Sequence, residues 1–120
     1  MAKYAILIYG DEAAAAGLSP EKQKELMDGW WGFEAELEKQ PGVRLAGEAL
    51  QPTASATSVR LENGKPLTTD GPFAETKEQL GGFYLLDVKD LDEALDWARK
   101  MPIEGGAVEV RPVQEFEPPQ

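Results

Sequence analysis

The segment from Thr69 to Val88, TDGPFAETKEQLGGFYLLDV, constrains the fold most, because it must leave one strand and enter another. Its Asp-Gly-Pro break is a strong turn signal, since glycine permits positive φ and proline fixes φ and lacks an N–H donor. The pair Gly81-Gly82 precedes an apolar run and is expected to form a bulge or a tight entry into the strand. Loops held between rigid strands often carry functional sites, so this segment is a natural place for one.

The rest of the chain alternates between strand and helix patterns. Ser19 is a good N-cap for a helix that starts at Pro20, and Asp90 is a good N-cap for a second helix that ends at Pro102. Asn63-Gly64 predicts a two-residue hairpin turn of type I′. Strands are expected at residues 3–9, 43–50, 56–61, 65–69, 82–88 and 107–113, and the first helix at residues 20–40. The expected apolar stripes are Leu26, Trp30, Phe33 and Leu37 on the first helix, and Leu91, Ala94, Leu95, Ala98 and Met101 on the second.

This order of elements predicts an α+β fold. It would be a ferredoxin-like sandwich with an inserted β-hairpin, in which two helices cover one face of an antiparallel sheet. A chain of 120 residues fits one domain, so residues 1–120 are expected to form a single unit. The first strand is apolar on both sides and is expected to be central and covered on both faces. Side chains such as Leu7, Phe83 and Leu85 would otherwise leave an apolar patch, and a second copy of the sheet, in a homodimer, is the simplest cover.

The composition excludes several classes of function. The chain has 12 basic and 22 acidic residues, a net charge of −10, which disfavours nucleic acids and anionic membrane surfaces as partners. It has no cysteine and no histidine, so thiol catalysis, Ser-His-Asp mechanisms and metal sites built on Cys or His are impossible. No apolar run approaches the ~20 residues of a membrane span, and no signal peptide precedes the first strand. A cytoplasmic protein without a cofactor is expected.

Three carboxylates are candidates for catalysis. Asp70 could act as a general base or ligand anchor, or could cap the backbone of Pro72-Phe73 in an Asx-turn. Glu48 lies between small residues in a strand and could line a cavity or face water. Glu78 could be a second catalytic carboxylate or could form solvated ion pairs worth less than ~1 kcal/mol. Together with Glu75, and beside Asp70, it could also bind a divalent cation, although nothing in the sequence fixes that geometry and no metal is expected.

The candidate ligand-binding residues are aromatic or basic. Phe73 could form an apolar wall of the site, or could pin its loop to the core. Lys77, on the same loop, could bind substrate or pair with a carboxylate. Trp30 and Tyr9 are large side chains of the kind that usually belongs to a core, although a tryptophan could instead line a pocket or a subunit contact.

The run DGPFAETKEQLGGFYLLDV, together with IYGDE near the start, GEALQP in the middle and VEVRPV near the end, resembles the DGPF subgroup of the YCII-related proteins. The resemblance spans nearly the whole chain and implies the dimeric α/β-barrel arrangement. Some YCII-related proteins have a histidine and an aspartate regarded as a possible active pair, and many DGPF members carry a histidine or tyrosine just before the final strand. This chain has Glu104-Gly105-Gly106 there, so proton transfer would need a carboxylate with a raised pKa or a tyrosine.

Three functions are compatible with these residues and this resemblance. The first is a small dimeric protein that binds a small molecule in a pocket near the DGPF loop, as an accessory to a regulator linked to an extracytoplasmic-function sigma factor. DGPF proteins are often encoded beside such factors. The second is an acid–base enzyme of lyase, isomerase or hydrolase type that acts on a small organic substrate through carboxylates. The third is a purely structural partner protein, which would have no cavity near Asp70. The residues alone leave open whether the protein is an enzyme.

Overall fold

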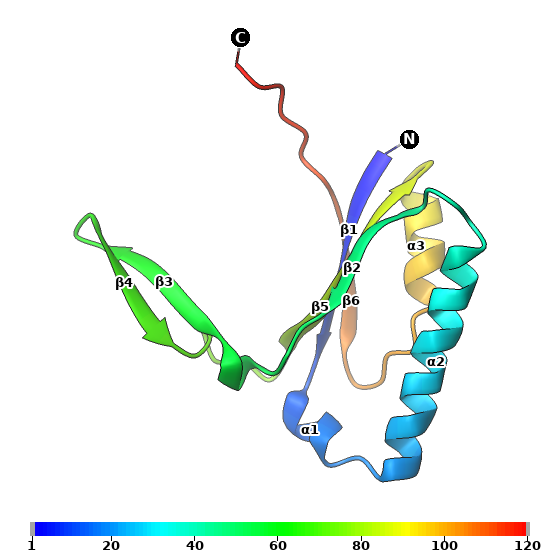
Figure 1. Cartoon of the computed structure of the whole chain (residues 1–120), viewed down its shortest axis with the longest axis horizontal. Helices are drawn as coiled ribbons and strands as arrows, with labels where there is room; N and C mark the ends of the chain where they lie inside the picture. The colour runs from blue at the N-terminus through cyan, green and yellow to red at the C-terminus, as the bar shows by residue number, and fades with distance from the viewer. Residues whose placement is uncertain (1, 120) are drawn as a thin grey trace.

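A computed structural model describes residues 2–119 and confirms the α+β class (Figure 1). The elements are β1 (Ala2–Gly10), α1 (Glu12–Ala16), α2 (Pro20–Glu38), β2 (Arg44–Ala49), η1 (Thr53–Ser55), β3 (Thr57–Glu62), β4 (Lys65–Asp70), β5 (Gln79–Val88), α3 (Leu91–Arg99) and β6 (Ala107–Pro112). Four strands form an antiparallel sheet in the order β2-β5-β1-β6, so β1 is an inner strand as expected. The helices α2 and α3 lie on one face of this sheet, which is consistent with a ferredoxin-like fold.

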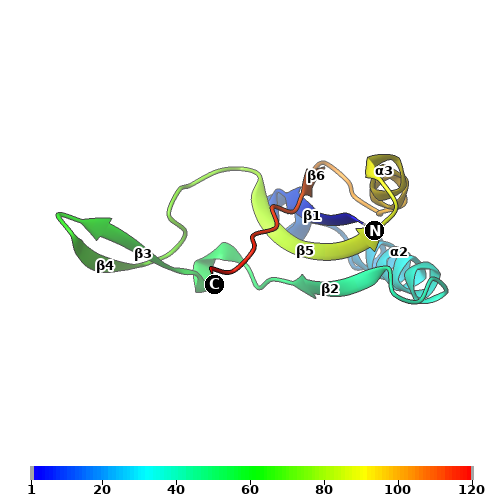
Figure 2. The same cartoon turned by 90° about the horizontal axis from the view of Figure 1, so that it is seen from above.

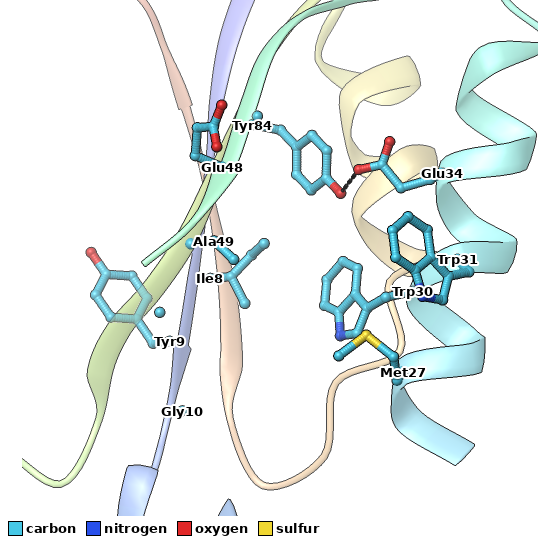
Figure 3. Close-up of a pocket in the computed structure, with 13 residues that line it drawn as sticks. Ile8, Tyr9, Gly10, Met27, Trp30, Trp31, Glu34, Glu48, Ala49 and Tyr84 are labelled. Carbon is cyan, nitrogen blue, oxygen red and sulfur yellow. Dashed lines mark hydrogen bonds between the residues drawn. The ribbon is translucent and has the colours of Figure 1, made fainter. Parts of the chain in front are cut away.

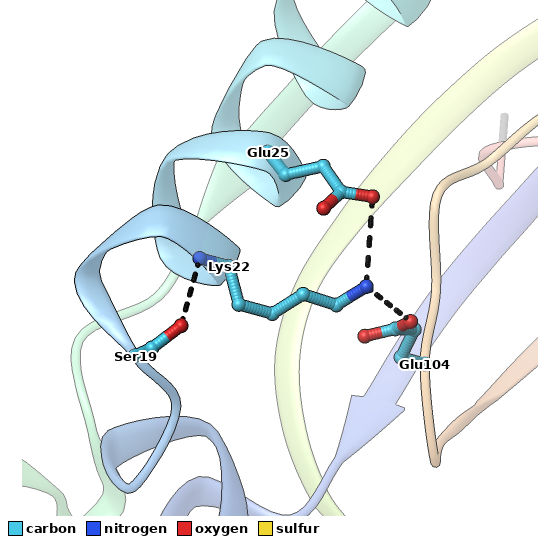
Figure 4. Close-up of polar contacts among 4 residues, drawn as sticks. All are labelled: Ser19, Lys22, Glu25 and Glu104. Carbon is cyan, nitrogen blue, oxygen red and sulfur yellow. Dashed lines mark hydrogen bonds and ion pairs between the residues drawn. The ribbon is translucent and has the colours of Figure 1, made fainter.

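Local capping signals fix where α2 begins. The Ser19 Oγ accepts the Lys22 N–H at 3.1 Å, and Pro20 occupies the first turn, where its missing N–H costs nothing. Figure 4 shows that the Lys22 side chain then reaches the loop before β6, where its Nζ lies 2.9 Å from Glu104. The same Nζ is 3.5 Å from Glu25, one turn further along the helix. These contacts join the start of α2 to the far edge of the sheet.

The core lies between the helices and one face of the sheet. Ile6, Leu86 and Val88 are fully buried, and Phe33 and Leu37 cover them from α2. On α3 the buried residues are Ala94 and Trp97, while Leu91 is 45% exposed. The apolar stripe expected on this helix was therefore wrong at Leu91 and omitted Trp97, because the sheet meets a face of α3 rotated from the one that the pattern predicted.

The other face of the sheet carries a second apolar set. The register pairs Leu7 with Phe83 and Ala5 with Leu85, and these alternate with the core-facing residues of β1 and β5. The two longer helices, α2 and α3, lie on the opposite side and do not cover this face (Figure 1). We expected both faces of β1 to be covered. Within one subunit, helices cover only the face that α2 and α3 contact.

The inserted hairpin β3–β4 projects away from the four-stranded sheet as a separate two-stranded arm (Figure 2). Its turn has φ of +52° at Asn63 and +78° at Gly64, the two positive values that a type I′ turn requires, so this prediction is confirmed. Every residue from 57 to 70 is exposed except Ser58, which is half-buried. The arm explains why the radius of gyration is 16.8 Å, when a compact chain of this length has about 14 Å.

The glycine pair Gly81-Gly82 lies inside β5, which begins at Gln79 and not at residue 82 as expected, and it forms a bulge. Ile8 pairs with Gly82 and Tyr9 pairs with Leu80, so Gly81 is an extra residue that has no partner in β1. This confirms one of the two roles expected for Gly81-Gly82. Of the helices described, none is both long enough and apolar enough to cross a bilayer.

Candidate functional site

A cavity of about 490 Å³ opens between α2 and the end of the sheet where β1, β2 and β5 meet (Figure 3). Figure 3 shows Trp30 and Met27 extending from α2 toward Ile8 and Ala49 on the strands, with the cavity between them. Trp31 borders the opening and is 67% exposed. A largely apolar concavity of this size, with a few polar groups, is the usual form of a small-molecule site.

Aromatic rings form the inner wall of the cavity. Trp30 and Tyr84 lie nearly parallel, with ring centroids 6.5 Å apart and planes 19° apart. Phe33 packs edge-on against both rings, at 5.8 Å from Trp30 and 5.5 Å from Tyr84. These contacts fix the two rings that face the cavity, because Phe33 itself is buried in the core.

A polar network closes the inner end of the cavity. The Tyr84 O–H donates to the Glu34 Oε1 at 2.5 Å, and the Arg44 Nε lies 3.5 Å from the other carboxylate oxygen. Arg44 also donates to the carbonyl of Gly47 at 3.0 Å, and its guanidinium carbon lies 5.8 Å from the centre of the Tyr84 ring. Burial and the Glu34 carboxylate raise the pKa of Tyr84 well above its ordinary value, and Arg44 opposes this only in part. Tyr84 therefore keeps its proton and acts as a hydrogen-bond donor at neutral pH.

Glycines from three neighbouring strands form the floor of the cavity: Gly10, Gly47, Gly81 and Gly82. Gly47 lies under the Tyr84 ring, where a Cβ would meet the ring carbons at 2.6 and 2.8 Å. At Gly82 a Cβ would lie 3.0 Å from the carbonyl oxygen of Glu48. A Cβ at Gly10 would meet nothing within 4 Å, and one at Gly81 only a carbonyl oxygen at 3.9 Å.

Three of the residues predicted from the sequence border this cavity: Trp30, Tyr9 and Glu48. The register places Glu48 opposite Phe83, on the face away from Trp30, and Figure 3 shows Tyr9 and Glu48 on that side of the strands. There the Tyr9 O–H donates to Glu109 at 3.3 Å. Partial burial and the Glu109 carboxylate raise the pKa of Tyr9.

The other predicted site residues lie elsewhere in this subunit. Asp70 ends β4, and Phe73, Lys77 and Glu78 lie on the loop that follows; none of the four is among the residues that line the cavity. Phe73 is 75% exposed, so its alternative role as a core anchor for the loop is wrong.

Arg60 organises the first part of this loop, because its guanidinium donates to the Phe73 carbonyl at 2.9 Å and lies 5.8 Å from the centre of the phenyl ring. Within residues 2–119 the side chain of Asp70 accepts no hydrogen bond, so the expected Asx cap is not formed. No cluster of three or more acidic side chains suited to a metal ion occurs in the same described range, so Glu75 and Glu78 do not assemble one.

The sequence reasoning missed Glu34, Tyr84 and Arg44, which make the polar end of the site. One signal could have found Glu34: it follows Trp30 by four residues on α2, so it lies at the flank of the apolar stripe rather than on the solvent side. For Tyr84, nothing local in the sequence indicated which polar group would meet its hydroxyl.

Comparisons with known proteins give one family match and one relative. A family model described as the YCII-related domain matches residues 2–117, nearly the full length of the chain. A protein of Rhizobium meliloti (strain 1021), described as uncharacterized, is 39% identical over 118 residues, which cover 96% of this chain and 94% of that protein.

Proposed function

Since the chain belongs to the YCII-related domain family, we propose that it is a small cytoplasmic homodimer that binds a small molecule in the cavity between α2 and the sheet. The observation that carries this proposal is the pairing of a fixed aromatic wall, Trp30 and Tyr84, with one polar cluster at its inner end. Such a combination supplies both the apolar area that gives affinity and the hydrogen-bonding groups that orient a ligand. Membership of the DGPF subgroup rests on the sequence resemblance described above.

The test of ligand binding is a screen of small metabolites by calorimetry and thermal shift, with wild-type protein and a Trp31→Ala variant. Trp31 is largely exposed at the opening, so its removal should weaken binding and leave the fold intact. Phe116→Ala is the matched control, since Phe116 is 84% exposed on the C-terminal tail and does not border the cavity. If no compound binds, or if every compound that binds is insensitive to Trp31→Ala, the proposed site is wrong.

Two features support a homodimer. The sheet face that carries Leu7 and Leu85 has no cover within the described subunit, and isolated two-stranded hairpins such as the β3–β4 arm are at best marginally stable. The arm contains two basic and two acidic residues, so the rest of the chain carries the whole net charge of −10. A second copy would bury the apolar face, and the neutral arm could approach it without repulsion.

Sedimentation equilibrium tests this part of the proposal. Wild-type protein should sediment as a dimer at micromolar concentration, and Leu85→Glu should give a monomer, because it places a charge on the proposed interface. Leu91→Glu is the control, since Leu91 is exposed on α3, on the helix side of the sheet. A monomeric wild-type protein, or a Leu85→Glu variant that remains dimeric, would overturn the proposed dimer.

In the proposed dimer, residues of the loop between β4 and β5 would help form the site of the partner subunit. We place Asp70, Phe73, Lys77 and Glu78 of one subunit at the site of the other, because the arm and its loop extend away from their own cavity (Figure 2). Mixed dimers test this: Asp70→Asn and Trp31→Ala subunits would each bind poorly alone, but together they would form one intact site per dimer. Recovery of binding at about half the wild-type stoichiometry supports the arrangement. Absence of recovery would place Asp70 and Trp31 in the same subunit's site.

An acid–base enzyme is the second candidate, and the Glu34–Tyr84 contact favours it. The carboxylate of Glu34 could accept a proton from a substrate, while the Tyr84 O–H, which donates to Glu34, would hold that carboxylate in place. If so, Glu34→Gln should abolish turnover of a substrate that still binds. The acidic surface would also suit contact with a basic segment of a sigma-factor-linked regulator, which co-purification with that regulator would test.

A further inference from the structure

The cavity beside α2, called the slot below, lies between two different surfaces. One side is the indole of Trp30, held nearly parallel to Tyr84, with Met27 and Trp31 also on the α2 side. The other side is the end of the sheet, where Ile8 and Ala49 lie beside glycines that present only backbone (Figure 3). A planar aromatic ring could lie between the two, because offset stacking on an indole and close approach to bare backbone both favour flat groups.

Packing inside the protein accounts for only part of the glycine floor. Gly47 and Gly82 are required by the Tyr84 ring and by the Glu48 carbonyl, since a Cβ at either would be too close. Gly81 is different, because a Cβ there would meet only the Ile8 carbonyl oxygen, at 3.9 Å, and its φ lies outside the left-handed region. The packing around Gly81 therefore leaves room for a Cβ, and Gly81 borders the cavity.

The charged residues around the slot favour a ligand whose polar group is a hydrogen-bond donor rather than an anion. Among the described residues that line the cavity, the charged ones are Glu34 and Glu48, and none is basic. Arg44 offsets part of the Glu34 charge from the strand side, at 3.5 Å, but does not border the cavity. A carboxylate or phosphate would therefore meet acceptors and a net charge of −10, whereas an amine or hydroxyl could donate to Glu34.

We propose that the slot takes a planar aromatic molecule, one or two rings in size, that carries an amine or hydroxyl group directed at Glu34. This rests on the proposed small-molecule site and adds the chemical class of its ligand. Stacking on Trp30 would supply most of the contact area, and an ammonium group would gain further from the aromatic wall and the carboxylate. The two parts of the proposal, planarity and a donor group, can be tested separately.

Four commercial probes separate these parts in calorimetric titrations of the full chain. They are 1-naphthylmethylamine, 1-naphthylmethanol, 1-naphthoate and the non-planar cyclohexylmethylamine. We expect the naphthyl amine to bind at least about tenfold tighter than the naphthoate, and about tenfold tighter than its cyclohexyl counterpart. In Glu34→Gln the preference for the amine over the naphthoate should shrink severalfold, because the carboxylate that selects the donor is gone.

Gly81→Val tests the location, because Gly81 borders the cavity and a Cβ there would meet only the Ile8 carbonyl oxygen, at 3.9 Å. Binding of the naphthyl amine should fall at least tenfold, while the urea midpoint stays within experimental error of the wild type. Gly32→Ala is the control, since a Cβ at this α2 residue meets nothing within 4 Å and Gly32 does not line the cavity. It should bind the probe as the wild type does.

Four results would overturn the inference: equal affinity for cyclohexylmethylamine, a preference for naphthoate, full binding by Gly81→Val, or failure of all three naphthyl probes. If the metabolite screen still finds a compound whose binding depends on Trp31, the small-molecule site stands and only the ligand class is wrong. If neither the probes nor the screen gives binding, the site itself is wrong.

Discussion

A single methyl group added at Gly47 should destabilise the protein measurably, because the Tyr84 ring already fills the space that it would occupy. The nearest ring carbons of Tyr84 would lie 2.6 and 2.8 Å from the new Cβ, against an optimal carbon–carbon separation of about 3.5–4.0 Å. The ring cannot retreat easily, since Tyr84 is only 7% exposed and packs against Trp30 and Phe33 on its other side. Its hydroxyl is also held by Glu34.

The expected cost follows from two opposing effects. Overpacking a filled site costs about 1–3 kcal/mol, while replacing glycine by alanine in a strand returns about 0.5–1 kcal/mol through backbone entropy. Gly47→Ala should therefore lower the free energy of unfolding by about 1–2 kcal/mol. Gly81→Ala receives the same entropic gain with only a carbonyl oxygen at 3.9 Å, so it should leave the free energy of unfolding unchanged or slightly higher.

Urea denaturation measures both variants, and a constant m-value would confirm that the folded and unfolded states are otherwise alike. A Tyr84→Val background provides an internal check, because valine lacks the two ring carbons that cause the clash. There Gly47→Ala should cost less than in the wild type. The reasoning is refuted if Gly47→Ala is as stable as Gly81→Ala, or if Tyr84→Val does not relieve its cost.

Three other predictions concern the same helix and network. In the folded protein Tyr84 keeps its proton to a higher pH than an unfolded tyrosine, whose pKa is about 10. The free energy of unfolding should therefore fall as the pH rises above about 10. Tyr84→Phe should flatten that fall in denaturation curves measured across this pH range; an unchanged slope would contradict it. Ser19→Ala should cost about 1 kcal/mol in urea denaturation, because the Lys22 N–H loses its acceptor, and a cost near zero would disprove the cap. Trp31→Ala should change stability by less than about 0.5 kcal/mol, since the indole is 67% exposed; a larger loss would mean that Trp31 supports the fold.

Local signals in the sequence were sufficient to predict most of the elements. These signals act on residues only a few positions away in the chain. The starts of α2 and α3 and the hairpin turn therefore fall where Ser19-Pro20, Asp90 and Asn63-Gly64 predict them. The Asp90 carboxylate, for example, accepts the Glu93 N–H at 3.0 Å. The inner position of β1 followed from its apolar residues on both faces.

The site was harder to predict, because its parts come together only through tertiary packing. Glu34 and Tyr84 are 50 positions apart, and their contact depends on how α2 crosses the sheet. The arm is a second case: the turn at Asn63-Gly64 specifies a hairpin, but no local pattern states whether that hairpin joins the main sheet. Asp70 does lie where a strand ends, next to the predicted turn. That it would not line the cavity of its own subunit could not be predicted, because this depends on where the arm lies.

The glycines at this end of the sheet fall into two groups, those where packing excludes a side chain and those where it does not. A Cβ at Gly106 would lie 2.1 Å from the Tyr9 carbonyl oxygen, so packing excludes a side chain at this position. Gly47 and Gly82 likewise have neighbours that exclude a side chain. Gly10 and Gly81 have none, although each glycine in a strand costs about 0.5–1 kcal/mol relative to alanine. No neighbouring atom excludes a side chain at these two positions, and both glycines border the cavity.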